Sequence, residues 1–194
     1  RHLNRPVSRW LSRYLVRTTV SPNQVSLASW ILSCVAAGLM ALGGYPALAA
    51  GGVLAQLASI IDGCDGEIAR LKYSQSKFGG WFDAVLDRYA DAFLLFGLMW
   101  HEFASTGAYL PLLLGFAAIV GSFLNSYTAD KYDGLMAQRL QGAPYFRLGR
   151  DVRMFVIFLG AILNQALVTL GVVALVMNVE VVRRIVVCRR ADAK

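Results

Sequence analysis

The sequence predicts an all-α integral membrane protein with six transmembrane helices, preceded by an N-terminal interfacial amphipathic helix. Hydrophobic residues make up 57% of the 194 residues, only 16% are charged, and the mean hydropathy is +0.51. This composition favours a chain in contact with a lipid bilayer over a soluble domain of equal length. The formal net charge is +7, but the basic residues flank apolar segments. We therefore expect no nucleic-acid partner.

The first 20 residues are predicted to form a basic juxtamembrane helix. Arginine recurs there at every fourth position while apolar side chains fall on another side, as expected of a helix lying in the membrane interface. The arginines are Arg1, Arg5, Arg9, Arg13 and Arg17. A nucleic-acid-binding arm is the weaker interpretation of this pattern.

The first two transmembrane helices are predicted at residues 22–42 and 46–73. Ser21-Pro22 is a typical helix start, and the glycines and the proline of the sequence GGYP end the first span. The second segment exceeds the ~20 residues needed to cross the hydrocarbon. Its end, with Arg70, is therefore expected to project into the interface.

Four more spans are predicted after a short turn at residues 74–77, which makes the second and third spans antiparallel neighbours. A polar stretch at His101 and Glu102 and a cytoplasmic segment at residues 130–150 are expected to separate later spans, and the tail 183–194 is expected to fray. The remaining spans are residues 78–100, 108–128, 151–163 and 167–182.

The distribution of basic residues predicts the topology. All 19 Lys and Arg residues fall in the N-terminal helix, between residues 70 and 88, between 131 and 153, and after 182. The loops on the other face carry none, which satisfies the positive-inside rule. We expect a multi-pass protein of the cell membrane with both termini and the site on the cytoplasmic side.

Four aspartates stand out in the second and third spans. Asp62 and Asp65 are three residues apart, and Asp83 and Asp87 are four apart, so each pair shares a helical face. Carboxylates at membrane depth are costly and usually functional. Two such faces turned together offer an all-oxygen site suited to a hard divalent cation.

The aspartates belong to a longer motif, D-x-x-D-G-x-x-A-R, eight residues, then G-x-x-x-D-x-x-x-D. It resembles the signature of the CDP-alcohol phosphotransferases, membrane enzymes that transfer a phospho-alcohol from a CDP-alcohol to an acceptor hydroxyl and release CMP. The motif residues are Asp62, Asp65, Gly66, Ala69, Arg70, Gly79, Asp83 and Asp87. The resemblance implies a membrane domain at residues 21–190. Because the chain begins without methionine, a soluble upstream domain is also expected.

The resemblance implies roles for the motif residues. Asp62, Asp65 and Asp83 would bind metal, and Asp87 would share metal binding with the role of catalytic base. Two ions are expected, Mg²⁺ or alternatively Mn²⁺. The CDP-binding set would be Asn23, Asp62, Gly66, Ala69, Arg70, Gly79 and Asp83. For the glycines, close helix packing is the alternative interpretation, and for Asn23 it is a polar residue at a helix start.

An acceptor-phosphate site is predicted where basic residues begin the fifth span. Arginines three residues apart share a helical face and bind phosphate well. The set is Lys131, Arg147, Arg150 and Arg153. Positive-inside flanking is the alternative interpretation. The stretch GRDVRMF resembles family members that make phosphoinositol products, either the di-myo-inositol-phosphate-phosphate synthases or the phosphatidylinositol-phosphate synthases. The first subgroup, which we favour, implies CDP-inositol and inositol phosphate as substrates.

Other hypotheses remain open at this stage. A phospholipid synthase would use CDP-diacylglycerol with inositol phosphate or glycerol phosphate. A cation-coupled transporter would need ionisable residues spread over several spans, and a scaffold would leave the aspartates without a role. Small residues in the spans indicate close helix packing and leave a homodimer open. They are Gly51, Gly52, Gly115 and Gly121.

Overall fold

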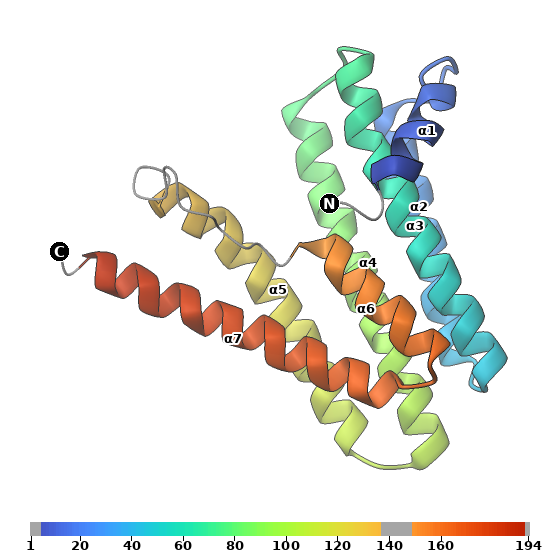
Figure 1. Ribbon diagram of the computed structural model, residues 1–194, viewed down its shortest axis with the longest axis vertical. Coiled ribbons are helices and arrows are strands. Elements are labelled where there is room, and N and C mark those ends of the chain that lie inside the picture. Colours follow the sequence, from blue (N-terminus) through green and yellow to red (C-terminus); the bar gives the residue numbers. More distant parts are fainter. Residues whose placement is uncertain (1–4, 137–148, 193–194) are drawn as a thin grey trace.

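The computed structural model describes residues 5–136 and 149–192, and this part of the chain contains helices and no strands (Figure 1). The predicted all-α class is therefore confirmed. The helices are α1 (Arg5–Leu15), α2 (Pro22–Ala41), α3 (Tyr45–Leu71), α4 (Lys77–Thr106), α5 (Leu110–Met136), α6 (Arg150–Ile162) and α7 (Ala166–Asp192).

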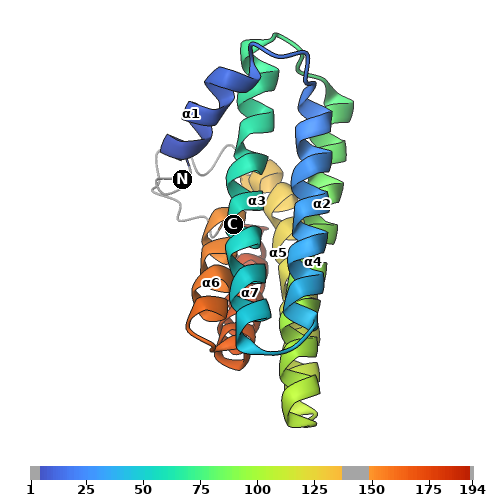
Figure 2. The same ribbon diagram turned by 90° about the vertical axis from the view of Figure 1, so that its right-hand side faces the viewer.

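The helices form two groups joined through α4 and α6. Helix α2 packs against α3 and α4, α5 packs along α7, and α6 lies against α3 and α7. Figure 1 shows α5 and α7 diverging from the α2–α3 pair, and Figure 2 shows α1 on the outside of α3, near the turn into α4. The ends of α3 and α4 that carry the motif therefore meet at one end of the bundle.

Local sequence signals fix the helix starts near the motif. Ser21 caps α2, since its hydroxyl accepts a hydrogen bond from the backbone N–H of Gln24 and its own backbone N–H donates one to Oε1 of the Gln24 side chain. Ser76 caps α4 by accepting from the Gly79 amide at 2.9 Å. The predicted helix start at Ser21-Pro22 is confirmed.

Helix α1 has two unlike faces. Trp10 and Tyr14 are exposed, whereas Ser8 and Ser12 are buried. The hydroxyl of Ser8 lies 3.4 Å from Oε1 of Glu67, within the motif region of α3. The small serine face thus lets α1 approach α3 closely, and the aromatic side chains point away from the protein.

Three helices extend further than the sequence analysis predicts. Helix α4 continues through His101 and Glu102 to Thr106, so the polar stretch expected there is helical. Helix α5 continues to Met136 through the start of the expected cytoplasmic segment, and α7 continues to Asp192 instead of fraying after residue 182. Glu, Lys and Arg are good helix formers, and ion pairs from Glu180 to Arg183 and Arg184 support α7.

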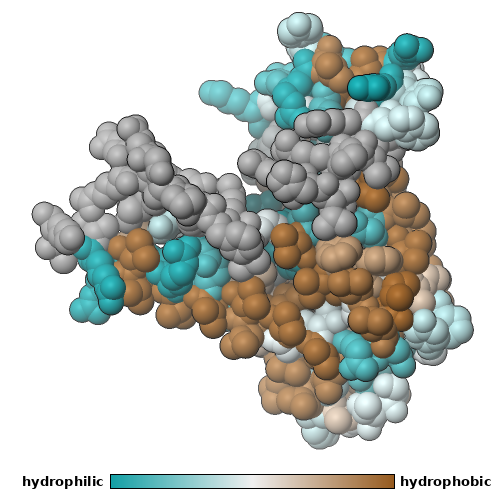
Figure 3. Space-filling model, in the orientation of Figure 1, coloured by the Kyte–Doolittle hydropathy of each residue, from teal (hydrophilic) through white to brown (hydrophobic). Residues whose placement is uncertain are grey.

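Four of the described helices are long and apolar enough to cross a membrane: Pro22–Ala41, Tyr45–Leu71, Leu110–Ala129 and Ala166–Arg190. Helix α4 has 30 residues but carries several ionisable groups in its first half. Helix α6 has 13 residues, or about 20 Å at the usual rise, less than the ~30 Å hydrocarbon thickness. Figure 3 shows apolar residues across the middle of the molecule and hydrophilic residues at the end that includes the α3–α4 turn.

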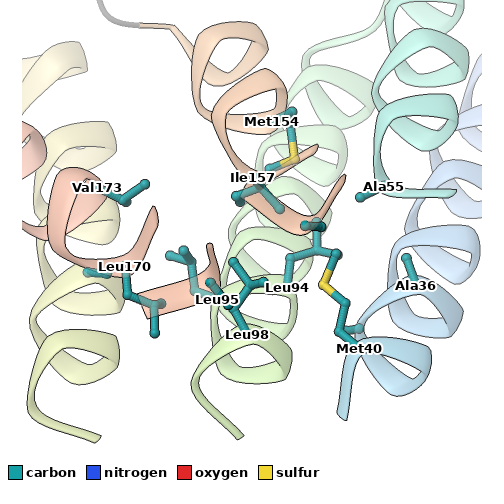
Figure 4. Close-up of a cluster of buried hydrophobic side chains, with 14 of the residues drawn as sticks. Ala36, Met40, Ala55, Leu94, Leu95, Leu98, Met154, Ile157, Leu170 and Val173 are labelled. Atoms are coloured by element: carbon teal, nitrogen blue, oxygen red, sulfur yellow. The ribbon is translucent and has the colours of Figure 1, made fainter. Parts of the chain in front are cut away.

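A continuous apolar core holds the two helix groups together. Figure 4 shows Leu94, Leu95 and Leu98 of α4 at its centre, between residues of α2, α6 and α7. All three leucines are fully buried. The core lies further along α4 than the aspartates, so packing there fixes the depth and rotation of the α4 face that carries them.

Glycines allow the closest helix crossings. The residues at 51, 52, 115 and 121 are all buried, and a methyl group added at any of them would collide with another helix of the same chain. Close packing within the chain therefore accounts for these four glycines. The tightest backbone crossing involves Gly97, where an added methyl carbon would lie 2.6 Å from the carbonyl oxygen of Ala37 in α2.

We predict that Gly97→Ala destabilises the protein by about 1–3 kcal/mol, since the obstructing atoms are backbone and cannot swing away. Gly38→Ala in α2 is the matched control, because nothing lies within 4 Å of a methyl group there. It should be neutral or stabilising by up to about 1 kcal/mol, the helix-propensity gain. Thermal unfolding in detergent measures both, and equal stability of the two variants would contradict the described α2–α4 crossing.

Candidate active site

Three motif carboxylates converge between α3 and α4. Asp62, Asp83 and Asp87 each offer an oxygen atom, and these atoms all lie within 4.8 Å of one another. Asp83 Oδ1 is buried and has no hydrogen-bond partner within the described residues. Closely spaced carboxylates with a free buried oxygen fit a hard divalent cation such as Mg²⁺ or Mn²⁺. We call these three residues the carboxylate cluster.

The fourth motif aspartate lies beside this cluster. Asp65 Oδ2 accepts a hydrogen bond from the Ser26 hydroxyl at 2.6 Å, and Oδ1 accepts one from the Gly66 amide. The three ligand atoms that meet within 4.8 Å do not include an oxygen of Asp65. Its role as a metal ligand stays a prediction.

A pocket of about 310 Å³ opens beside the cluster, and we call it the first pocket. Its wall includes six of the seven residues expected to bind CDP, Asp62 being the exception. These are Asn23, Gly66, Ala69, Arg70, Gly79 and Asp83. A methyl carbon added at Gly79 would lie 3.0 Å from the Ser76 hydroxyl and 3.1 Å from Asn23 Oδ1, so a small residue is needed there.

A second, smaller pocket of about 130 Å³ lies on the other side of the cluster. Asp83 lines the first pocket, whereas Asp87, one helical turn further along α4, lines the second. Arg88, Arg150, Arg153 and Arg184 also line the second pocket. The carboxylates therefore stand between a polar pocket and an arginine-rich one.

Arg150 connects α6 to the carboxylate cluster. Its Nη1 pairs with Asp62 Oδ2 and lies 2.6 Å from Asp87 Oδ1, and its Nε lies 3.5 Å from Asp91 Oδ1. Arg153, one turn along α6, forms a buried ion pair with Asp91. Two of the four residues predicted to bind an acceptor phosphate are thus brought to the second pocket.

The structure describes no side chain for the other two residues predicted to bind the acceptor phosphate. Arg147 falls outside the described residues, and only the backbone of Lys131 is described, within α5. Their roles stay predictions.

The structure adds residues that the sequence analysis did not single out. The Ser29 hydroxyl donates to Asp62 Oδ1 at 3.0 Å, and Ser26 does the same for Asp65. Serines at positions 26, 29 and 33 of an apolar span share one helical face, a signal that could have identified them. Arg184 is buried and donates to the backbone oxygen of Asn125 at 2.6 Å. Its place in a basic tail gave no such signal.

The family comparison agrees with the motif. The family model described as CDP-alcohol phosphatidyltransferase matches residues 19–186. The chain therefore belongs to the CDP-alcohol phosphatidyltransferase family, and the predicted resemblance is confirmed.

Relatives with curated descriptions are similar over nearly the whole chain. A "Bifunctional IPC transferase and DIPP synthase" from Rubrobacter xylanophilus is 42% identical over 190 residues, which cover 98% of this chain and 42% of that protein. A protein of the same description from Aquifex aeolicus is 36% identical, covering 94% and 42%. An archaetidylinositol phosphate synthase from Pyrococcus horikoshii is 25% identical, covering 94% and 90%. The chain thus spans less than half the length of the two bifunctional relatives.

Solved structures share the fold. A crystal structure of Mycobacterium tuberculosis phosphatidylinositol phosphate synthase with CDP-DAG bound matches with a TM-score of 0.77 at 22% identity, covering 94% of each chain. A second structure of that protein, in complex with manganese and citrate, matches with a TM-score of 0.75 at 24% identity, covering 93% of this chain and 88% of that one.

Proposed function

We propose that residues 21–190 form a membrane phosphotransferase domain that moves a phospho-alcohol group from a CDP-alcohol to an acceptor hydroxyl and releases CMP. The observation that carries this proposal is the position of the carboxylates. Asp83 lines one pocket and Asp87 the other, so a donor and an acceptor bound in the two pockets would meet at the cluster. Family membership supports the same reaction class.

The first pocket suits the nucleotide and pyrophosphate of the donor. Arg70 supplies positive charge, and the amide of Asn23 supplies both a donor and an acceptor for a base or sugar. Gly66 and Gly79 let the pyrophosphate approach the helix backbone closely. Ala69 lines the same wall and adds little bulk.

The carboxylate cluster would hold the divalent metal, with Asp62, Asp83 and Asp87 as ligands and Asp65 completing the set. We propose Mg²⁺ or Mn²⁺, with two ions present during the reaction. When bound, the metal polarises the attacked phosphorus and stabilises charge on the leaving CMP. Ser29 orients Asp62 by donating to Oδ1, which leaves Oδ2 to face the centre of the cluster.

The second pocket would take the acceptor. Its arginines suit a phosphorylated alcohol, because guanidinium groups bind phosphate through paired hydrogen bonds. Arg150 and Arg153 line this pocket, and we propose that they bind the acceptor phosphate together with Lys131 and Arg147. Asp87 lines this pocket and is the carboxylate proposed to accept the proton of the attacking hydroxyl.

For substrates, we propose CDP-inositol and inositol phosphate, giving di-myo-inositol phosphate phosphate. The support is the relatives described as DIPP synthases, which are 42% and 36% identical to this chain. A phospholipid synthase using CDP-diacylglycerol with inositol phosphate or glycerol phosphate is the second candidate. It is favoured by the same fold in a structure with CDP-DAG bound.

We also propose that the domain spans the cell membrane six times, with α4 and α6 joining the four apolar helices. Both termini and the two pockets would face the cytoplasm. The basic residues beside the spans support this orientation by the positive-inside rule. Residues 1–20 would lie in the interface, with the exposed Trp10 and Tyr14 of α1 towards lipid.

We predict that Asp83→Asn lowers CMP release by about 10²-fold or more while the protein stays folded. An amide is a poorer metal ligand, and even changes to groups that only support a ligand cost about 10–100-fold. Glu102→Gln is the matched control, since Glu102 lies near the opposite end of the same helix. It should retain wild-type turnover. Full activity of Asp83→Asn would refute the assignment of the cluster.

A second prediction concerns the substrate. Purified protein with Mg²⁺ should release CMP from CDP-inositol in the presence of inositol phosphate, and not from CDP-diacylglycerol with inositol phosphate or glycerol phosphate. Chromatographic detection of CMP measures both. Turnover with CDP-diacylglycerol alone would establish the phospholipid synthase instead.

A further inference from the structure

Arg150 lies where a bound cation would be expected. Its Nη1 contacts Asp62 and Asp87, two of the three carboxylates of the cluster. A divalent cation held by the same carboxylates would lie close to the guanidinium, and the two positive charges would repel each other. We therefore expect the contacts of Arg150 with Asp62 and Asp87 to weaken when a metal binds at the cluster.

Burial explains why this arginine is held by the carboxylates. The side chains of Asp62 and Asp87 are each 18% exposed, and that of Arg150 is 15% exposed. Carboxylates removed from water need a compensating positive charge nearby. Arg150 provides that charge in the absence of metal. A divalent cation would provide it more strongly and would also repel the guanidinium.

The second pocket offers the released guanidinium a place. Arg150 already lines that pocket, together with Arg153 and Arg184. Its Nε lies 3.5 Å from Asp91 Oδ1, a carboxylate outside the cluster that also lines this pocket. A guanidinium freed from Asp62 and Asp87 has donors available for a tetrahedral oxyanion in the pocket.

We propose that Arg150 exchanges between two partners: the carboxylates of Asp62 and Asp87 when the cluster lacks metal, and the phosphate of the acceptor when the cluster holds it. This inference rests on the proposed function and concerns the order in which its ligands bind. Metal binding prepares the acceptor site, and an oxyanion in the second pocket tightens metal binding. Because binding free energies are linked, both effects have the same factor.

Arg153 provides a matched control on the same helix. It has the same side chain and lines the same pocket, but within the described residues it pairs with Asp91 and not with the cluster. Arg150→Gln removes the competing charge from the cluster. Arg153→Gln removes an equal charge from the pocket and from Asp91, and leaves the contacts of Arg150 with the cluster in place.

The test is Mn²⁺ binding to purified protein in detergent, measured from the electron paramagnetic resonance signal of free Mn²⁺. Wild type, Arg150→Gln and Arg153→Gln are titrated in sodium sulfate and in sodium chloride of equal ionic strength. We expect Arg150→Gln to bind Mn²⁺ about tenfold more tightly than wild type, and Arg153→Gln to stay within about twofold. Sulfate should tighten Mn²⁺ binding to wild type about fivefold, within the usual range of such coupling, and leave Arg150→Gln unchanged.

The exchange is refuted if Arg150→Gln binds Mn²⁺ no more tightly than wild type, or if sulfate has no effect on wild type. If Arg150→Gln does not fold, as judged by size-exclusion chromatography, the sulfate effect on wild type decides alone. Failure of the proposed function gives a different result. In that case wild type binds no Mn²⁺, or Asp83→Asn binds it as tightly as wild type does.

Discussion

Three aspartates of α3 and α4 share the guanidinium of Arg150, and this contact holds the start of α6 against the helices that carry the site. Asp62, Asp87 and Asp91 all lie within ion-pair distance of Arg150, which begins α6. Charges in this setting are stable only when paired. The pairing holds the start of α6 at the end of the α3–α4 hairpin, where Arg150 and Arg153 line the second pocket.

A single turn of α4 separates the two pockets. Asp83 and Asp87 lie on the same face of α4, one turn apart, and Asp83 lines the pocket with Arg70 whereas Asp87 lines the pocket with Arg153. The leucines of the apolar core pack α4 against α2, α6 and α7, and Gly97 lets α4 lie directly against α2. Helix packing along α4 thus sets the position of the reacting groups. In the proposed function, a donor and an acceptor bound in the two pockets would meet at the carboxylates between them.

The sequence was sufficient for the helix class and for the approach of Asp62, Asp83 and Asp87, because both depend on local spacing, but the role of Asp65 as a metal ligand stays a prediction. Aspartates three or four residues apart share a helical face, and a short turn makes the two faces neighbours. It was insufficient where partners lie far apart in the chain. Arg150 meets Asp62 across 88 residues, and no spacing predicts that contact. Helix ends at Thr106 and Met136 were also missed, since polar residues there signal a loop although they continue the helix.

The most direct test of the account is a crystal structure of the protein with Mn²⁺ and CMP, with anomalous diffraction recorded at the manganese edge. The account predicts an anomalous peak bound by Asp62, Asp83 and Asp87, with CMP in the pocket lined by Asn23 and Arg70. A peak away from these carboxylates, or CMP bound elsewhere, would contradict it.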